Sequence, residues 1–155
     1  MDNKTFTILI IEDEPDISEL IEYNLTQSGY SIIVSNNGEK GIENTRKHLP
    51  DLILLDLMLP GIHGIDVCRI LKNDKDTSGV SIIMLTALGQ EENIVKGLET
   101  GADDYVTKPF SFPVLEARIQ SVLRRVKTED IENENVSISG IVISSRKREV
   151  LINGK

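Results

Sequence analysis

The sequence lacks several features that would each have pointed to a class of protein. It has a single cysteine, Cys68, which excludes an intramolecular disulfide. No apolar run approaches the roughly 20 residues that a membrane-spanning helix needs. The N-terminal stretch has no basic segment before an apolar one and no small-residue cleavage site, so we expect no signal peptide. Together these absences predict a cytoplasmic location and no membrane partner.

Motifs for several kinds of chemistry are also missing. The chain has no defensible serine, histidine and aspartate set, no glycine-rich phosphate loop, and no cysteine and histidine pattern for a metal. We interpret His48 and His63 as exposed, and Cys68 as a core thiol on an apolar helix face. The excess of 25 acidic over 17 basic residues, a net charge of −8, disfavours non-specific nucleic-acid binding by the bulk of the surface.

What the chain does have is an alternation of short apolar runs and helical patterns. We predict strands over the runs 6–11, 30–34, 52–55, 81–85 and 105–107. The intervening segments carry apolar residues at helical spacing, with Leu20 and Ile70 among those expected to face inward. Short βα connections require a parallel sheet with helices on both faces. We therefore predict an α/β fold of the (βα)5 type, a doubly wound, flavodoxin-like parallel sheet of five strands in the order 2-1-3-4-5.

Acidic residues follow the first and third predicted strands. The predicted order places these strands side by side, so Glu12, Asp13 and Asp56 should converge at the carboxyl edge of the sheet, where such folds bind ligands. Three close carboxylates repel one another until a proton or a cation joins them, and oxygen-only ligands suit Mg²⁺. Acids at strand ends can instead cap the following helices, which is the interpretation we favour for Glu14. With Asp56 included, the other three favour a metal site.

A hydroxyl and an ammonium group are expected at the same edge. Thr86 ends the fourth predicted strand and Lys108 ends the fifth. Acids with Mg²⁺, a hydroxyl donor and a lysine form a site for a phosphoryl group, because the cations neutralise its oxygens and the hydroxyl donates to them. Taken singly, a strand-end turn at Thr86 or a salt bridge at Lys108 is the simpler interpretation, but five such residues at one edge favour a shared site. The Lys108–Pro109 bond can be cis or trans, and the sequence does not decide which.

Four segments around these residues carry a resemblance to a known family. They read IIEDE at 10–14, LLDLMLPGIHG at 54–64, MLTA at 84–87 and GADDYVTKPF at 101–110. In this order they closely resemble the receiver domain of bacterial two-component response regulators. The wording LETGADDYVTKPF followed by ARIQSVLRR is similar to the OmpR/PhoB subfamily. The resemblance covers about residues 4–127.

The resemblance implies a role for each acid. Asp56 matches the phosphoacceptor, which takes a phosphoryl group from a sensor histidine kinase to form an acyl phosphate. Asp13 and Asp56 match direct Mg²⁺ ligands, and Glu12 matches an acid that acts through a bound water. The main-chain carbonyl of Met58 would be a further ligand. Such a protein promotes its own phosphorylation and slow dephosphorylation, and we do not expect an enzyme that turns over a substrate.

The resemblance also implies a switch. Thr86 and Lys108 match the residues that hold the phosphoryl oxygens, and Tyr105 matches the aromatic residue that moves inward when the threonine hydroxyl swings to the phosphate. Met58 and Leu88 flank the expected phosphate, and neither side chain can orient a water. We therefore expect slow hydrolysis of the acyl phosphate.

In the subfamily, two copies usually form a homodimer through the face made by the fourth helix, fifth strand and fifth helix. Charge pairs cross this interface. Asp104 and Arg118 are present as one such pair. Ile94 and Val114 stand where opposite charges are expected. We predict that an apolar contact replaces that pair, or that the dimer is altered.

The C-terminal segment suggests a second domain. We predict a receiver domain over residues 1–127, a polar linker over 128–135, and the opening strands of an incomplete winged-helix DNA-binding domain over 136–155. Because the chain ends before a recognition helix, we expect specific DNA binding and control of transcription only through the missing part.

Three alternatives remain open. A stand-alone receiver would act by binding a protein partner. A phosphatase with an aspartyl nucleophile would often carry a second acid two residues on, where this chain has Met58. A flavodoxin-like cofactor binder would need to accept a nucleotide phosphate, which an acidic, glycine-poor site repels.

Overall fold

The computed structural model describes residues 4–87 and 91–139 of the chain. Strands and helices alternate throughout, and their bounds are β1 (Thr7–Ile11), α1 (Pro15–Gln27), β2 (Ser31–Ser35), α2 (Gly38–His48), β3 (Leu52–Asp56), α3 (Gly64–Asn73), β4 (Ser81–Ala87), α4 (Glu91–Thr100), β5 (Asp104–Lys108) and α5 (Phe112–Ser139). The chain divides into two units, Met1–Val122 and Leu123–Lys155, and the features described below belong to the first, apart from the C-terminal part of α5. No helix in the described ranges is long and apolar enough to cross a bilayer.

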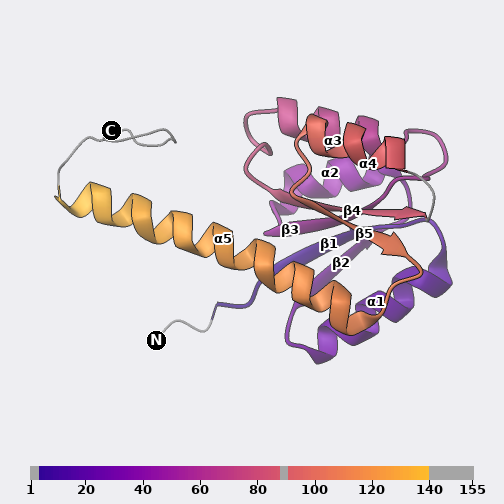
Figure 1. Ribbon diagram of the computed structural model, residues 1–155, viewed down its shortest axis with the longest axis horizontal. Coiled ribbons are helices and arrows are strands. Elements are labelled where there is room, and N and C mark those ends of the chain that lie inside the picture. The colour runs from indigo at the N-terminus through magenta and orange to yellow at the C-terminus, as the bar shows by residue number, and fades with distance from the viewer. Residues whose placement is uncertain (1–3, 88–90, 140–155) are drawn as a thin grey trace. The chain divides into compact units, whose positions relative to one another are not determined.

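The sheet has the predicted topology. Its five strands are parallel and lie in the order β2-β1-β3-β4-β5, so the α/β doubly wound prediction is confirmed. Helices α2, α3 and α4 cover one face of the sheet, and α1 lies on the other face with the first turns of α5 (Figure 1). Both faces of the inner strands are therefore covered, which explains their uninterrupted aliphatic sequences.

Two of the three inner strands, β1 and β3, form the centre of the core. Every residue of Ile8–Ile11 and Leu52–Leu55 is fully buried. Each such aliphatic side chain contributes about 1.5–3 kcal/mol to the stability of the fold. Register pairs Ile11 with Leu55. The residues that follow this pair are therefore held side by side at the carboxyl edge.

The connection from β3 to α3 is packed tightly against the strand end. The Gly64 amide donates to the Leu57 carbonyl oxygen at 3.1 Å. A Cβ atom on Gly64 would overlap the Asp56 carbonyl oxygen and would come within 2.7 Å of Leu57 Cα. Only glycine can therefore begin α3 so close to the tip of β3. This close approach fixes the loop that carries Met58.

Two residues that were predicted to face inward, Leu20 and Ile70, are exposed, so these predictions are wrong. Ile70 is 38% exposed, and Leu20 is also exposed. On α3 the buried positions are Val67, Cys68 and Leu71, a narrow stripe that leaves Ile70 at its edge. On α1, Ile21 and Leu25 fill the contact with the sheet, so Leu20 lies outside the buried face of the helix. The exposed assignments of His48 and His63 and the buried assignment of Cys68 are confirmed.

Helix α5 is longer than predicted. We expected it to end near residue 127 and to give way to a linker, but it continues through 128–135 to Ser139. Neither proline nor glycine occurs between Pro113 and Gly140, so the sequence contains no strong signal to stop the helix. Residues 136–139, predicted as strand, are helical too. Residues 140–155 lie outside the described ranges, and the domain boundaries themselves stay a prediction, because a helix can join domains as well as a coil.

Candidate functional site

Three carboxylates meet at the carboxyl edge of β1 and β3. Glu12 and Asp13 follow β1 directly, and Asp56 is the last residue of β3. One carboxylate oxygen from each lies within 4.8 Å of the others. Glu12 is 1% exposed and Asp56 is 4% exposed, while Asp13 is half-buried. Buried acids at this spacing need a compensating cation or a shared proton.

Lys108 supplies part of that compensation. Its Nζ lies 3.2 Å from Glu12 Oε1 and 3.4 Å from Asp56 Oδ1. The residue ends β5, two strands from β3 in the sheet, and its long side chain spans the β4 position to reach the acids. Burial alone would lower the pKa of Lys108, but the carboxylates of Asp56 and Glu12 together raise it. The ammonium therefore keeps its charge in the site.

One lysine does not balance the acids. Burial, followed by repulsion from Asp56, raises the pKa of Glu12 to about 7, even though Lys108 acts in the opposite direction. Near neutral pH the metal-free site thus holds a proton on Glu12 for part of the time. A divalent cation bound by the same oxygens would remove the need for that proton.

Backbone amides orient two of the carboxylates. The Met58 amide donates to Asp56 Oδ1 at 3.1 Å, and the Glu14 amide donates to Glu12 Oε2 at 3.2 Å. Asp56 Oδ1 is therefore occupied by Met58 and Lys108, whereas no described residue donates to Oδ2. Met58 itself follows the strand end by two residues, and its side chain is 54% exposed.

Thr86 lies beside Asp56 on the neighbouring strand. Register pairs Asp56 with Leu85, so Thr86 is the next residue along β4. Its side chain is 1% exposed, and among the described residues its hydroxyl has a single, long hydrogen bond, to the Ala87 carbonyl oxygen at 3.5 Å. Buried hydroxyls usually have better partners. Among the described residues, this hydroxyl therefore has only a weak acceptor.

The remaining predicted residues lie on α4, β5 and α5. Tyr105 on β5 is 37% exposed. Asp104 and Arg118 form an ion pair of 3.5 Å within the chain. Val114 is 50% exposed and Ile94 is half-buried. The structure thus places the four predicted interface residues on these three elements, apart from the acid cluster. Leu88 lies outside the described residues.

The sequence alone missed a pocket beside Lys108. It has a volume of about 460 Å³, lies between α1 and the start of α5, and is lined by Asp16, Ile17, Leu20, Ile21, Lys108, Pro109, Phe110 and Phe112. The Phe110 and Phe112 rings meet edge to face, with centroids 5.9 Å apart. The two aromatic residues that follow Lys108–Pro109 closely in the sequence were the available signal. The Lys108–Pro109 bond, which the sequence left open, is cis.

The geometry agrees with a known family. The chain belongs to the response regulator receiver domain family, whose model matches residues 8–120. It is a receiver domain of the PhoB and OmpR type, and response regulators are signalling proteins. The resemblance seen in the sequence is therefore confirmed.

Individual relatives support this assignment. The phosphate regulon transcriptional regulatory protein PhoB of Pseudomonas aeruginosa is 45% identical over 149 residues, which cover 96% of this chain and 65% of that protein. The DNA-binding response regulator MtrA of Mycolicibacterium smegmatis is 43% identical over 155 residues, with 100% and 66% covered. The BeF3-activated receiver domain of RstA from Klebsiella pneumoniae is similar in structure, with a TM-score of 0.71, 36% identity, and 76% of this chain and 98% of that chain covered. The chain thus spans less than two thirds of the length of its curated relatives.

Proposed function

We propose that this chain is the phosphoacceptor part of a transcriptional regulator, and that Asp56 receives a phosphoryl group from a sensor histidine kinase. The observation that carries the proposal is the cluster at the sheet edge. Three acids offer oxygens within 4.8 Å of one another, and Lys108 reaches two of them. A cluster of this composition suits phosphoryl transfer, because its cations can neutralise phosphoryl oxygens as the bond forms.

The donor set fits Mg²⁺. Glu12, Asp13 and Asp56 offer only oxygen atoms, and Mg²⁺ prefers a few carboxylates with several retained waters. We assign Asp13, Asp56 and the Met58 main-chain carbonyl as direct ligands, and Glu12 as an acid that acts through water. When bound, the ion would offset the negative charge of the acids and polarise the phosphoryl oxygens.

The protein's own groups then carry the transfer. Asp56 Oδ1 is held by Met58 and Lys108, which leaves Oδ2 as the attacking oxygen. A bond forms between Oδ2 and phosphorus while the nitrogen–phosphorus bond of a phosphohistidine breaks, and the electron pair leaves on the imidazole. Lys108 donates to one phosphoryl oxygen, and the weakly bonded Thr86 hydroxyl donates to another. The pocket beside Lys108, with Phe110 and Phe112 in its wall, is where we place the donor protein.

Phosphorylation would switch the surface of α4, β5 and α5. When the Thr86 hydroxyl turns to the phosphate, the space it leaves can admit the partly exposed Tyr105 ring. A homodimer would then form across this face. Because Val114 and Ile94 are apolar, we propose that their contact replaces an ion pair at the centre of the interface.

The intact protein would use this switch to control transcription. We propose that the receiver spans residues 1–127, that 128–135 joins it to the next domain, and that 136–155 begin a winged-helix DNA-binding domain. Relatives that the chain matches over nearly its whole length are named as transcriptional or DNA-binding regulators. A cytoplasmic location, with the kinase as donor, belongs to the same proposal.

The direct test is acyl phosphate formation. We expect incubation with acetyl phosphate and Mg²⁺ to add one phosphoryl group by intact mass. Asp56→Asn should abolish the mass increase, because an amide cannot act as the nucleophile. The matched control is Asp76→Asn, an exposed residue in the loop before β4. A mass increase that survives in Asp56→Asn, or that persists undiminished with EDTA, would contradict the proposal.

A further inference from the structure

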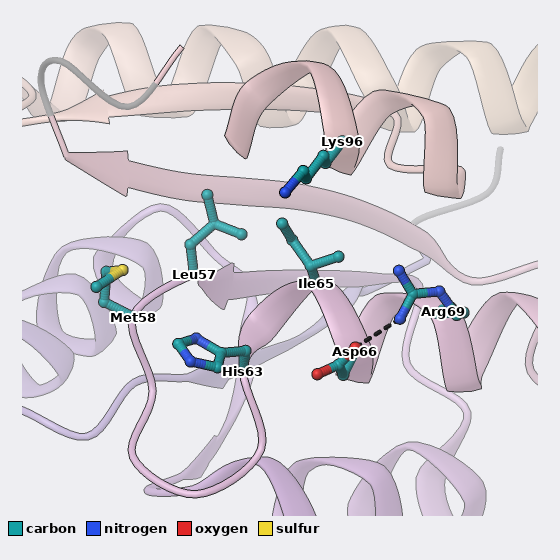
Figure 2. Close-up of a pocket in the computed structure, with 7 residues that line it drawn as sticks. All are labelled: Leu57, Met58, His63, Ile65, Asp66, Arg69 and Lys96. Carbon is teal, nitrogen blue, oxygen red and sulfur yellow. Dashed lines mark hydrogen bonds and ion pairs between the residues drawn. The ribbon is translucent and has the colours of Figure 1, made fainter. Parts of the chain in front are cut away.

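The described part of the chain contains a cavity that the proposed phosphoryl chemistry does not use. Its volume is about 380 Å³, and it lies between the loop after β3, the first turns of α3 and the middle of α4. Figure 2 shows its lining residues, which are Leu57, Met58, His63, Ile65, Asp66, Arg69 and Lys96. Small-molecule sites usually have volumes of about 300–1,000 Å³, so the cavity is large enough for a compact ligand.

One part of the cavity is apolar. Leu57 is buried and Ile65 is half-buried, and the two side chains lie next to each other (Figure 2). The flexible thioether of Met58 borders them. A methionine side chain adapts to the shape of an apolar ligand. This part suits a short aliphatic or aromatic tail.

The other part is positively charged. Lys96 extends from α4 with its ammonium group toward Leu57 and Ile65 (Figure 2). Within the described residues it forms no ion pair, although Glu92 and Glu99 lie one turn away on the same helix.

The second cation, Arg69, already forms one ion pair within the chain. Arg69 binds Asp66 through Nη1, and its guanidinium carries further N–H donors. Arg69 and Lys96 bring two positive charges, and Asp66 brings one negative charge. These three groups therefore sum to one positive charge, in a chain whose net charge is −8. A ligand with a single negative charge complements this balance better than a doubly charged phosphate.

We propose that this cavity binds a small amphipathic carboxylate. The carboxylate lies between Arg69 and Lys96, where the planar guanidinium offers paired donors and the ammonium adds charge. The apolar tail packs against Leu57 and Ile65. His63, at the start of α3, closes the opposite side with a polar ring.

The cavity is connected to the phosphoacceptor through the backbone. Leu57 and Met58 follow Asp56 directly, and the Met58 amide holds Asp56 Oδ1 at 3.1 Å. The Gly64 amide ties the Leu57 carbonyl to the start of α3. A ligand that contacts both side chains therefore acts on the segment that orients Asp56. Binding and phosphorylation must then change each other's equilibrium by the same factor. This coupling rests on the proposed function, whereas the binding itself does not.

Octanoate is a suitable probe of the site. We expect titration of the ¹⁵N-labelled chain to give saturable shifts in the amides of Leu57, Ile65 and Lys96, with a Kd of about 1 mM. Lys96→Gln should weaken binding about tenfold, because it removes a charge-assisted contact. Lys47→Gln, at an exposed position on α2, should leave the affinity unchanged. The neutral analogue octanamide should bind about tenfold more weakly than octanoate.

Three results would overturn the binding site: no saturation, equal affinity for octanamide, or equal affinity in Lys96→Gln. A second measurement separates the site from the proposed function. The Kd of octanoate, measured by the same titration, should differ between the Asp56-phosphorylated and the unphosphorylated wild-type chain. An identical Kd for the two forms refutes the coupling. Octanoate binding without any phosphorylation of Asp56 refutes the proposed function and leaves the site standing, and phosphorylation without binding does the reverse.

Discussion

Two regions of this receiver reverse the usual distribution of polar and apolar side chains. At the sheet edge, Glu12 and Asp56 are charged groups that are almost fully buried. On α4 and α5, Val95, Leu98 and Val114 are apolar groups that are exposed. Charged residues are rarely buried, and large apolar groups gathered on a surface often mark an interaction site. In the proposed function, the first region binds charge and the second binds the surface of another copy of the chain.

The two regions differ in what holds them. The acids are placed by strands whose aliphatic residues are fully buried, so their positions are set by the core. The exposed apolar residues lie on helices and contribute little to the core. Substitutions at the sheet edge should therefore change both stability and chemistry, whereas substitutions on the helical face should change association alone.

The largest effect is expected from Lys108→Gln. The substitution removes the ammonium that lies 3.2 Å from Glu12 and 3.4 Å from Asp56. Loss of one preorganised donor at a site of developing charge costs about 100- to 1,000-fold in rate. We expect that decrease in the phosphorylation rate with acetyl phosphate, measured by intact mass. Lys40→Gln, exposed on α2, is the control. Equal rates in the two variants would remove Lys108 from the chemistry.

Glu12→Gln should reveal the cost of burying a charged Glu12 beside Asp56 as a pH dependence of stability. In the folded chain the pKa of Glu12 is raised from 4.5 to about 7. Folding therefore favours the protonated form, and the resulting stabilisation is complete below pH 4.5 and is lost as pH rises through about 7. The shift corresponds to at most about 3 kcal/mol.

Urea unfolding in EDTA at several pH values measures this contribution. We expect the free energy of unfolding of the wild-type chain to fall from pH 5 to pH 8 relative to that of Glu12→Gln, which lacks the titrating group. Glu39→Gln, on the exposed side of α2, should follow the wild type. Parallel curves for the wild type and Glu12→Gln would show that the pKa of Glu12 is not raised in the folded chain.

The sequence predicted the acid cluster at the sheet edge well, because one physical rule connects the hydrophobic pattern of a strand to the position of the residue that follows it. Uninterrupted aliphatic runs mark inner parallel strands, and the residue after each run then lies at a common edge. Glu12, Asp56 and Thr86 follow from this rule, whereas Lys108 ends the edge strand β5, which has no such aliphatic run. The cis bond before Pro109 does not, because local sequence tolerates either isomer.

Features that depend on contacts between distant elements were not predictable in the same way. Lys96 and His63 line one cavity, although Lys96 lies on α4 and His63 lies in the loop before α3. The exposure of Ile70 depends on the width of the contact between α3 and the sheet. The length of α5 was misjudged because polar composition was read as a linker, while the absence of proline and glycine was the stronger signal.

A smaller effect is expected on the helical face, from Val114→Glu. A single carboxylate placed against Ile94 of a partner copy would have to be desolvated without a cation, so we expect at least about tenfold weaker dimerisation of the beryllofluoride-treated chain. Sedimentation measures the dimer. The wild-type dimer should also change little with salt, because apolar contacts are not screened. Adding Ile94→Lys to Val114→Glu should restore association and make it sensitive to salt.

Tyr23→Glu, at an exposed position on α1, is the matched control for that experiment. If it weakens the dimer as much as Val114→Glu does, the interface does not lie on α4, β5 and α5. A strongly salt-sensitive wild-type dimer would instead show that ion pairs such as Asp104 with Arg118 dominate the interface.

The smallest effect is expected at Met58, which combines features of both regions. Its side chain is apolar and exposed, and it lies beside the buried acid Asp56. A thioether cannot orient an attacking water, so the acyl phosphate should persist for much longer than seconds. Met58→Asn supplies an amide that can hold a water, and a gain of about 1 kcal/mol in transition-state stabilisation would speed hydrolysis about fivefold. The main-chain carbonyl is kept, so phosphorylation itself should be unaffected, whereas Met58→Leu should hydrolyse like the wild type. A wild-type half-life of seconds, measured by loss of the phosphoryl mass, would mean that another group positions the water.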